Sequence, residues 1–376
     1  MRLSDAVGLA GGEARPELLA EVLTRAGSLA VQRSLDVLRF DAEATSPDGR
    51  PASVVVVNSN SMVCRARRLD GGDSVVVIPL GILARARALA RRLLHLLSRS
   101  SVTDVVIGNV IDRRPDWELA PGLVPLFGEQ TDQDGEQCWS ALKAFDAESP
   151  EDETRDSIAD DIMELSLHYL VGHELAHLYG RHDRLLALAL ALAQAGDRLV
   201  PPDLSLSDLR RGLEVHADLM AAMTVAHRLL PFVMHSDERG TLIARQFFAV
   251  AMLFGMYDTH RKSLTAYEHG RYPHPVIRFE LTHCVTLDVV GKVAPEFLET
   301  ARKNALAGWA ESDRGMSAME IDCVRGHFGW PSQGDTTRFV PVTTLKYGST
   351  SRVLPAYMDL EYRLGRQVAS MLEELE

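Results

Sequence analysis

The pattern of hydrophobic and polar residues changes character near residue 149. Before that point, β-branched runs at residues 53–58 and 74–78 stand on either side of an Asp-Gly-Gly-Asp turn at 70–73. After it, apolar residues recur every three or four positions, which is typical of amphipathic helices. The pattern predicts an α+β fold that is mainly α, with a small β-sheet and helices in the N-terminal part and a helical core after it.

Helices are also expected on both sides of the N-terminal strands. Residues 1–38 have an amphipathic pattern, residues 62–68 are a further strand candidate, and a helix is expected to begin at Pro79 and run to about residue 97. We interpret the arginines of that helix as its solvent-exposed face. They are Arg85, Arg87, Arg91 and Arg92.

The second half of the chain contains clear helix boundaries. The Ser-Pro-Glu-Asp run at 149–152 is a strong helix start, because a capping serine is followed by a proline and two acidic residues. Gly180 is expected to end this first helix, and Pro231 is expected to end the third. The predicted helices cover residues 149–180, 183–195, 205–230 and 240–258.

Composition and charge narrow the choice of partners and compartment. The net charge of −12 disfavours nucleic acid as a partner, because phosphate binding needs a basic face. The apolar stretches at 185–193 and 242–257 are shorter than the roughly 20 residues of a membrane span, and the N-terminus lacks the apolar core of a signal peptide. Four widely spaced cysteines exclude a Cys-x-x-Cys site and favour free, buried thiols in a reducing compartment. We therefore expect a cytoplasmic protein.

The run His-Glu-Leu-Ala-His at 173–177 is the most specific chemical signal in the chain. A spacing of four places His173 and His177 on one helix face, where the two imidazoles can share a metal ion. Glu174 lies beside that pair and can act as a general base toward a water molecule that the metal activates. The run predicts a site for one catalytic Zn²⁺, which also needs a third protein ligand.

Two acidic residues compete for the place of the third ligand. Glu214 and Asp218 are four residues apart on one helix face, so Glu214 can bind the metal while Asp218 accepts a hydrogen bond from a ligating histidine. Asp183 is the alternative, because it follows His177 closely after the turn at Gly180. We favour Glu214, since two carboxylates on an apolar face need a metal or a cationic partner. His216 lies off the face that they share and is left out.

These residues resemble the gluzincin metallopeptidases. The local Glu-x-x-Ala-Asp form at 214–218 is similar to that of the HtpX-type membrane peptidases and the phage-exclusion Lit-type peptidases. Because no stretch of this sequence is expected to span a membrane, as those of the HtpX type do, the resemblance favours the soluble Lit-type. A weaker element, His274-Pro275-x-x-Arg278, is similar to a segment downstream in such proteins. The resemblance covers residues 150–280. It implies a helical zincin-type core and a specific protein substrate, with a host translation protein as the kind of target.

The segment before residue 275 is rich in hydrogen-bond donors. Tyr272 and His274 are candidates to stabilise the oxyanion of a peptidase reaction. We expect Arg278 to have a structural role as the partner of an acid.

The sequence thus predicts a zinc metalloendopeptidase that acts on a protein or peptide. We expect three regions: an N-terminal α/β region at 1–148, a helical metallopeptidase core at 149–290 and a mixed region at 291–376. The alternative is a non-catalytic interaction or defence protein stabilised by zinc, which would need a fourth protein ligand such as His182 or Asp183.

Overall fold

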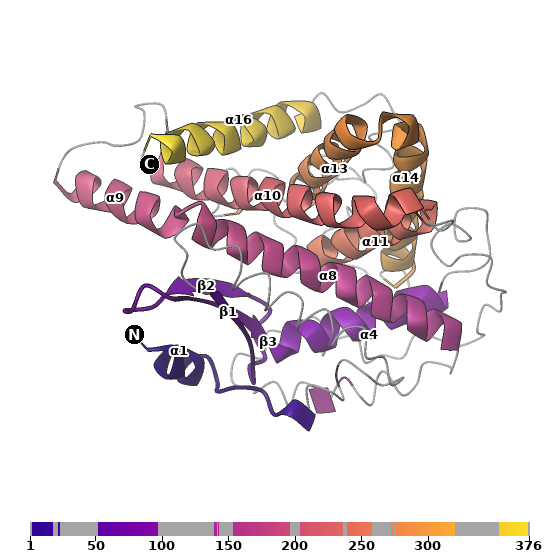
Figure 1. Cartoon of the computed structure of the whole chain (residues 1–376), viewed down its shortest axis with the longest axis horizontal. Coiled ribbons are helices and arrows are strands. Elements are labelled where there is room, and N and C mark those ends of the chain that lie inside the picture. The colour runs from indigo at the N-terminus through magenta and orange to yellow at the C-terminus, as the bar shows by residue number, and fades with distance from the viewer. Residues whose placement is uncertain are drawn as a thin grey trace, which may run out of the picture.

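The structure is a computed structural model that describes most of the chain. The described residues are 2–17, 22, 52–96, 139–140, 142, 153–195, 204–235, 239–257, 272–273, 275–319 and 353–374. Helices dominate them, and the strands form one small sheet near the N-terminus (Figure 1). The expectation of an α+β fold that is mainly α is confirmed.

The sheet has three strands in the order β1-β3-β2. Strand β1 (Ala52–Val57) runs parallel to β3 (Ser74–Pro79), and β2 (Arg65–Arg68) pairs antiparallel with β3 at the edge of the sheet. Alternate valines of β1 and β3 point to opposite faces, as the pleat requires. One face enters the main core, and the other packs against helix α1 (Leu3–Leu9).

The expected amphipathic helix over residues 1–38 is wrong in its first part. Helix α1 ends at Leu9, and the chain then passes through Gly11 and Gly12, whose φ angles are 107° and 80°. A side chain at Gly11 would collide with the backbone of Asn58, since its Cβ would lie 2.4 Å from that carbonyl oxygen. This turn lets Glu13 bridge to Val57 beside the sheet. Residues 16, 17 and 22 are helical, and residues 18–21 and 23–38 lie outside the described residues.

Helix α4 (Leu80–Leu96) lies near its predicted position, but the arginines whose side chains are described do not face solvent. The side chain of Arg92 is outside the described part of the chain. Arg85, Arg87 and Arg91 are at most 3 % exposed. Each has a polar partner in the interior: Arg85 donates to the Asn60 side chain, and the other two pair with acids of helix α8, namely Asp160 for Arg87 and Asp156 for Arg91. Buried cations are tolerated only with such partners, so these three arginines belong to the core and do not form the expected solvent-exposed face.

Long helices make up the rest of the described chain. They are α8 (Glu153–Tyr179), α9 (His182–Gln194), α10 (Leu206–His235), α11 (Arg239–Tyr257), α13 (Pro275–Val293), the short η2 (Pro295–Phe297), α14 (Leu298–Met319) and α16 (Val353–Glu373). The four predicted helices are found at α8, α9, α10 and α11, but the predicted start of the first at 149–152 lies outside the described residues. The predicted end at Pro231 is wrong, because α10 continues to His235; a proline removes one backbone donor, and the surrounding tertiary packing can offset that loss.

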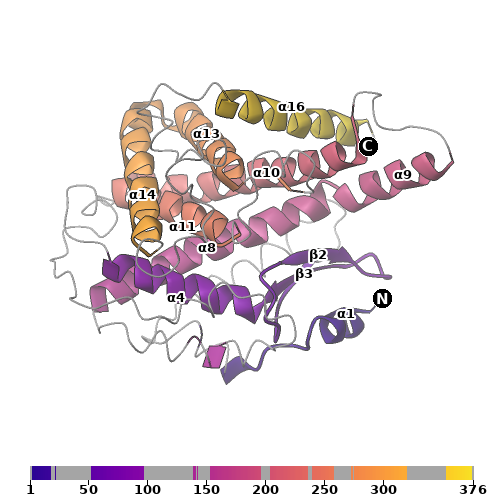
Figure 2. The same cartoon turned by 180° about the vertical axis from the view of Figure 1, so that it is seen from behind.

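Helix α8 crosses the middle of the molecule. The sheet and α4 lie on one side of it, and α10 with α16 lies on the other, in both views (Figures 1 and 2). Because α8 is covered on several sides, it buries apolar residues nearly all round. The main core draws on residues of β1, α8 and α14 alike, so the three expected regions pack against one another. Their division at residues 148 and 290 remains a prediction.

Two further observations bear on the sequence-based expectations. No helix within the described ranges is both long and apolar enough to cross a membrane. Two of the four cysteines are described, and both are free thiols: Cys64 is buried as expected, whereas Cys284 is exposed.

Candidate metal centre

Three side chains from two helices converge beside the sheet. His173 and His177 stand one turn apart on α8, and Glu214 faces them from α10. The Nε2 atoms of the two histidines are 3.1 Å apart, and Glu214 oxygens lie 3.5 Å from His173 Nε2 and 3.8 Å from His177 Nε2. Zinc ligands at bond lengths of about 2.0–2.1 Å in a tetrahedron are about 3.3 Å apart. The observed spacings therefore match a tetrahedral metal site.

The far nitrogen of His173 is held by a buried carboxylate. Asp218, one turn along α10 from Glu214, places Oδ1 at 2.9 Å from His173 Nδ1 and is 1 % exposed. Arg278 of α13 donates to both oxygens of Asp218, at 2.7 and 2.9 Å, and the Tyr169 hydroxyl donates to Oδ1 at 2.9 Å. These contacts fix the orientation of the His173 ring. The expected pairing of Arg278 with an acid is confirmed.

The electrostatics of the group favour a cation between its carboxylates. Burial alone would lower the pKa of His173, but its hydrogen bonds to Asp218 and Glu214 and their charges raise that pKa to about 10. Burial and the neighbouring His173 lower the pKa of His177 to about 4. Burial would raise the pKa of Asp218, but Arg278 and His173 outweigh this effect and lower it well below its usual range. A positive charge at His173 is thus strongly favoured, and a metal ion can take its place.

Glu174 occupies a dry position between α8 and the sheet edge. Its exposed fraction is 9 %, and its carboxylate accepts a hydrogen bond from the backbone of Ala66 in β2. Burial raises the pKa of Glu174 to about 7, although His173 acts in the opposite direction. A carboxylate with a pKa near neutrality can both take up and release a proton, which suits a general base.

The other sequence candidates lie in different surroundings. Asp183, the alternative third ligand, has a side chain that is 56 % exposed and lies 3.7 Å from Arg68. It is outside the group of possible ligands. Tyr272 is 39 % exposed just before α13, and His274 lies outside the described residues. The roles of Tyr272 and His274 in stabilising an oxyanion remain predictions.

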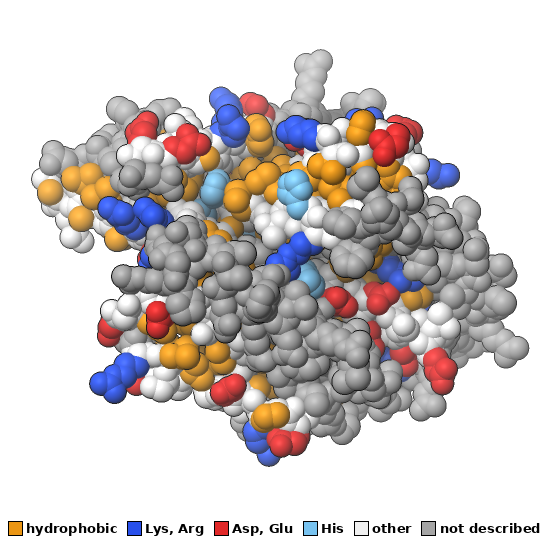
Figure 3. All heavy atoms as spheres, viewed as in Figure 1, with side chains coloured by type: hydrophobic (Ala, Val, Ile, Leu, Met, Phe, Trp, Pro, Cys, Tyr) orange, Lys and Arg blue, Asp and Glu red, His pale blue; other side chains and the backbone are white. Residues whose placement is uncertain are grey.

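Two further histidines adjoin the site: His182, which the sequence offers only as a fourth ligand of a closed zinc site, and His216, which is not among the expected ligands. His182 Nδ1 lies 2.7 Å from His177 Nδ1, and His182 Nε2 lies 2.9 Å from His216 Nδ1. His182 comes after a tight turn that ends the helix of His177. Helical spacing along the sequence therefore does not indicate the contact between the two histidines. His216 points off the face of Glu214, as expected, but that direction leads to His182. The space-filling view shows histidine side chains reaching the surface between hydrophobic groups (Figure 3).

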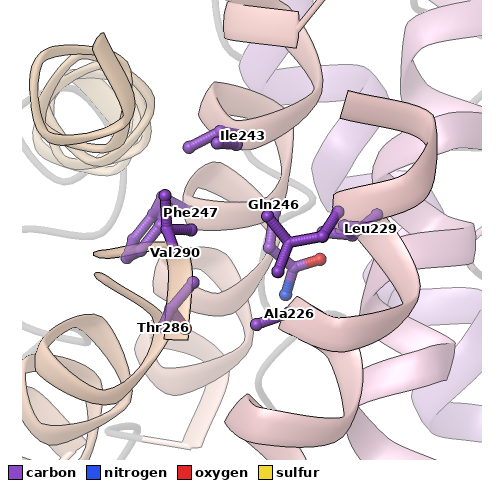
Figure 4. Close-up of a pocket in the computed structure, with 8 residues that line it drawn as sticks. Ala226, Leu229, Ile243, Gln246, Phe247, Thr286 and Val290 are labelled. Carbon is purple, nitrogen blue, oxygen red and sulfur yellow. The ribbon is translucent and has the colours of Figure 1, made fainter. Parts of the chain in front are cut away.

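A small cavity lies elsewhere in the helical core. It opens between α10, α11 and α13 and is lined mainly by apolar side chains (Figure 4). Its polar lining residues are Gln246 and Thr286. None of the residues that line it belongs to the metal centre.

Comparisons with known proteins give no indication of function, so any functional assignment rests on the geometry of the site. No family model, curated protein or solved structure matches the chain.

Proposed function

We propose that this chain is a zinc-dependent endopeptidase, with His173, His177 and Glu214 as metal ligands and Glu174 as general base. The observation that carries the proposal is the tetrahedral spacing of the three ligand groups beside a buried carboxylate whose pKa is raised to about 7. Two histidines and a glutamate with one open position are a ligand set typical of catalytic zinc.

The chain's own residues supply the proton transfers of hydrolysis. A zinc ion bound there acts as a Lewis acid and lowers the pKa of water toward about 7. Glu174 takes a proton from the attacking water as the carbonyl carbon of the substrate is attacked. Glu174 then gives that proton to the leaving amine, and its raised pKa suits both transfers.

The edge of the sheet supports a peptide as the substrate. Strand β2 is an edge strand, and the backbone of Ala66 within it touches Glu174. An extended peptide can add to an exposed strand edge through main-chain hydrogen bonds. A peptide bound along β2 would pass the general base, which favours peptide-bond hydrolysis over other reactions of a zinc-activated water.

The geometry disfavours the alternative, in which zinc only stabilises the fold of a non-catalytic interaction or defence protein. A closed structural site needs a fourth protein ligand. The two candidates for it are elsewhere: His182 contacts the Nδ1 side of His177, whereas the metal site is on the Nε2 side, and Asp183 pairs with Arg68. We therefore favour an enzyme with a specific protein substrate in the cytoplasm, and the resemblance to Lit-type peptidases makes a translation protein the first class to test.

The proposal is tested with zinc-loaded protein and a proteome-derived peptide library, with new termini read by mass spectrometry. We expect cleavage by the wild type and loss by Glu174→Gln of roughly a hundredfold or more, with zinc retained. Glu164→Gln, on the same helix but away from the ligands, is the matched control and should cleave normally. Equal cleavage by wild type and Glu174→Gln, or an inert zinc-loaded wild type on both the library and translation proteins, would contradict the proposal.

A further inference from the structure

A row of three imidazoles leads from the metal centre toward the surface. His177 is joined to His182 at 2.7 Å and His182 to His216 at 2.9 Å, each through ring nitrogens. Their ring centroids are 4.8 and 5.0 Å apart. His182 in the middle is 3 % exposed, whereas His216 is partly exposed.

The turn between α8 and α9 places His182 in this row. Helix α8 ends at Tyr179, Arg181 adopts a left-handed conformation with φ of 51°, and α9 begins at His182. Gly180 leaves the space that the His182 ring fills, because a Cβ at Gly180 would lie 2.7 Å from His182 Nε2. The chain therefore reverses so that His182 meets His177 from the side opposite the ligand group.

We infer that His182, supported by His216, is a positioning residue that fixes the tautomer and ring orientation of the metal ligand His177. This inference rests on the proposed zinc site. An N···N contact of hydrogen-bond length has room for only one proton, so one nitrogen of each touching pair must be bare. The proton positions along the row can then be derived one ring at a time.

Metal binding at His177 Nε2 determines which ring nitrogen carries the proton in each of the three histidines. With Nε2 used for the metal, the ring proton of His177 is on Nδ1, which donates to His182 Nδ1. His182 must then carry its proton on Nε2, and that nitrogen donates to His216 Nδ1. His216 in turn carries its proton on Nε2. The two histidine ligands are thus held differently: His173 by the carboxylate of Asp218, and His177 by a neutral imidazole.

The first test measures zinc affinity by competition with a chelator. His182→Phe keeps a flat ring but has no acceptor for His177 Nδ1–H, and we expect zinc binding to weaken about 10- to 100-fold. His182→Asn keeps a side-chain acceptor and should recover most of that loss, and His216→Phe should have a smaller effect than His182→Phe. The matched control is His227→Phe, which replaces an exposed histidine of α10 and should bind zinc like the wild type.

The second test reads the tautomers in the folded wild type, so it does not depend on a variant that folds. Histidine ¹⁵N NMR of the zinc-loaded protein should show protons on Nε2 of both His182 and His216. A proton on Nδ1 of His182, or zinc affinity unchanged in His182→Phe, overturns the inference. A wild type that binds zinc and cleaves peptides, together with a His182→Phe variant that binds zinc as tightly, would refute this inference alone. A wild type that binds no zinc would refute the proposed function as well.

Discussion

Replacing Asp218 by asparagine removes one negative charge at the centre of the hydrogen-bond network and keeps the side chain's shape. Asp218 accepts hydrogen bonds from Arg278 at 2.7 and 2.9 Å and from Tyr169 at 2.9 Å, and it also lies 2.9 Å from His173. An asparagine oxygen can still accept from His173. Its amide group, however, presents a donor to Arg278, which is itself only a donor.

The consequence for the metal follows from the position of Arg278. With Asp218 neutral, the nearby remaining carboxylate is Glu214, whose Oε2 is already 3.8 Å from Arg278 Nη2. Arg278 then competes with the metal for Glu214, and His173 loses the anion that raises its basicity. Loss of such a partner costs about 10- to 100-fold in metal affinity. This corresponds to about 1.4–2.7 kcal/mol of binding free energy.

The assay is zinc competition against a chelator of known affinity, with circular dichroism to show that Asp218→Asn is folded. Tyr169→Phe is the control, since it removes one neutral donor and leaves the Asp218 charge and the Arg278 pair in place. We expect Tyr169→Phe to weaken zinc by less than about tenfold. Zinc affinity of Asp218→Asn within about twofold of the wild type would refute the reasoning that Asp218 orients a metal ligand.

Two further predictions concern stability away from the metal. Arg87→Leu removes the buried cation that lies 3.7 Å from Asp160 and should lower the free energy of unfolding by about 3–5 kcal/mol in urea denaturation. The double replacement with Asp160→Leu should recover most of the loss, and equal losses in both variants would contradict this. Burial raises the pKa of Glu361 to about 7, so its contribution is fully present below its unfolded pKa of about 4.5 and is lost as pH rises through 7. Glu361→Gln should therefore flatten the fall in stability between about pH 4.5 and 7, and an unchanged pH profile would refute it.

The elements that the sequence predicts best have a strong pattern of apolar residues or a turn or glycine that marks their end. The valine run of β1 and the turn before β3 define the sheet, and Gly180 follows the last residue of α8. The prediction for Arg87 and Arg91 is wrong because a charged residue in a helix usually faces water. Their partners Asp160 and Asp156 are about seventy residues away in the chain, so only the tertiary structure shows that this face of α4 is buried.

The candidate site shows the same distinction between local and tertiary information. The i,i+4 spacing placed His173 beside His177, and Glu214 beside Asp218, on single helix faces, and helices α8 and α10 bring the two pairs together. The sequence suggested His182 only as a possible fourth zinc ligand and not as a partner of His177 Nδ1, since its place depends on the left-handed residue Arg181 in the turn. The spacing of apolar and polar residues along the chain does not indicate such a turn.

The most direct test of the central claim is the zinc content of purified wild type beside Glu214→Ala and Asp183→Ala. The account predicts about one zinc per wild-type chain, lost in Glu214→Ala and kept in Asp183→Ala, because Glu214 faces the two histidines and Asp183 faces Arg68. Zinc that is kept in Glu214→Ala and lost in Asp183→Ala, or a wild type that binds none when zinc is supplied, would contradict it.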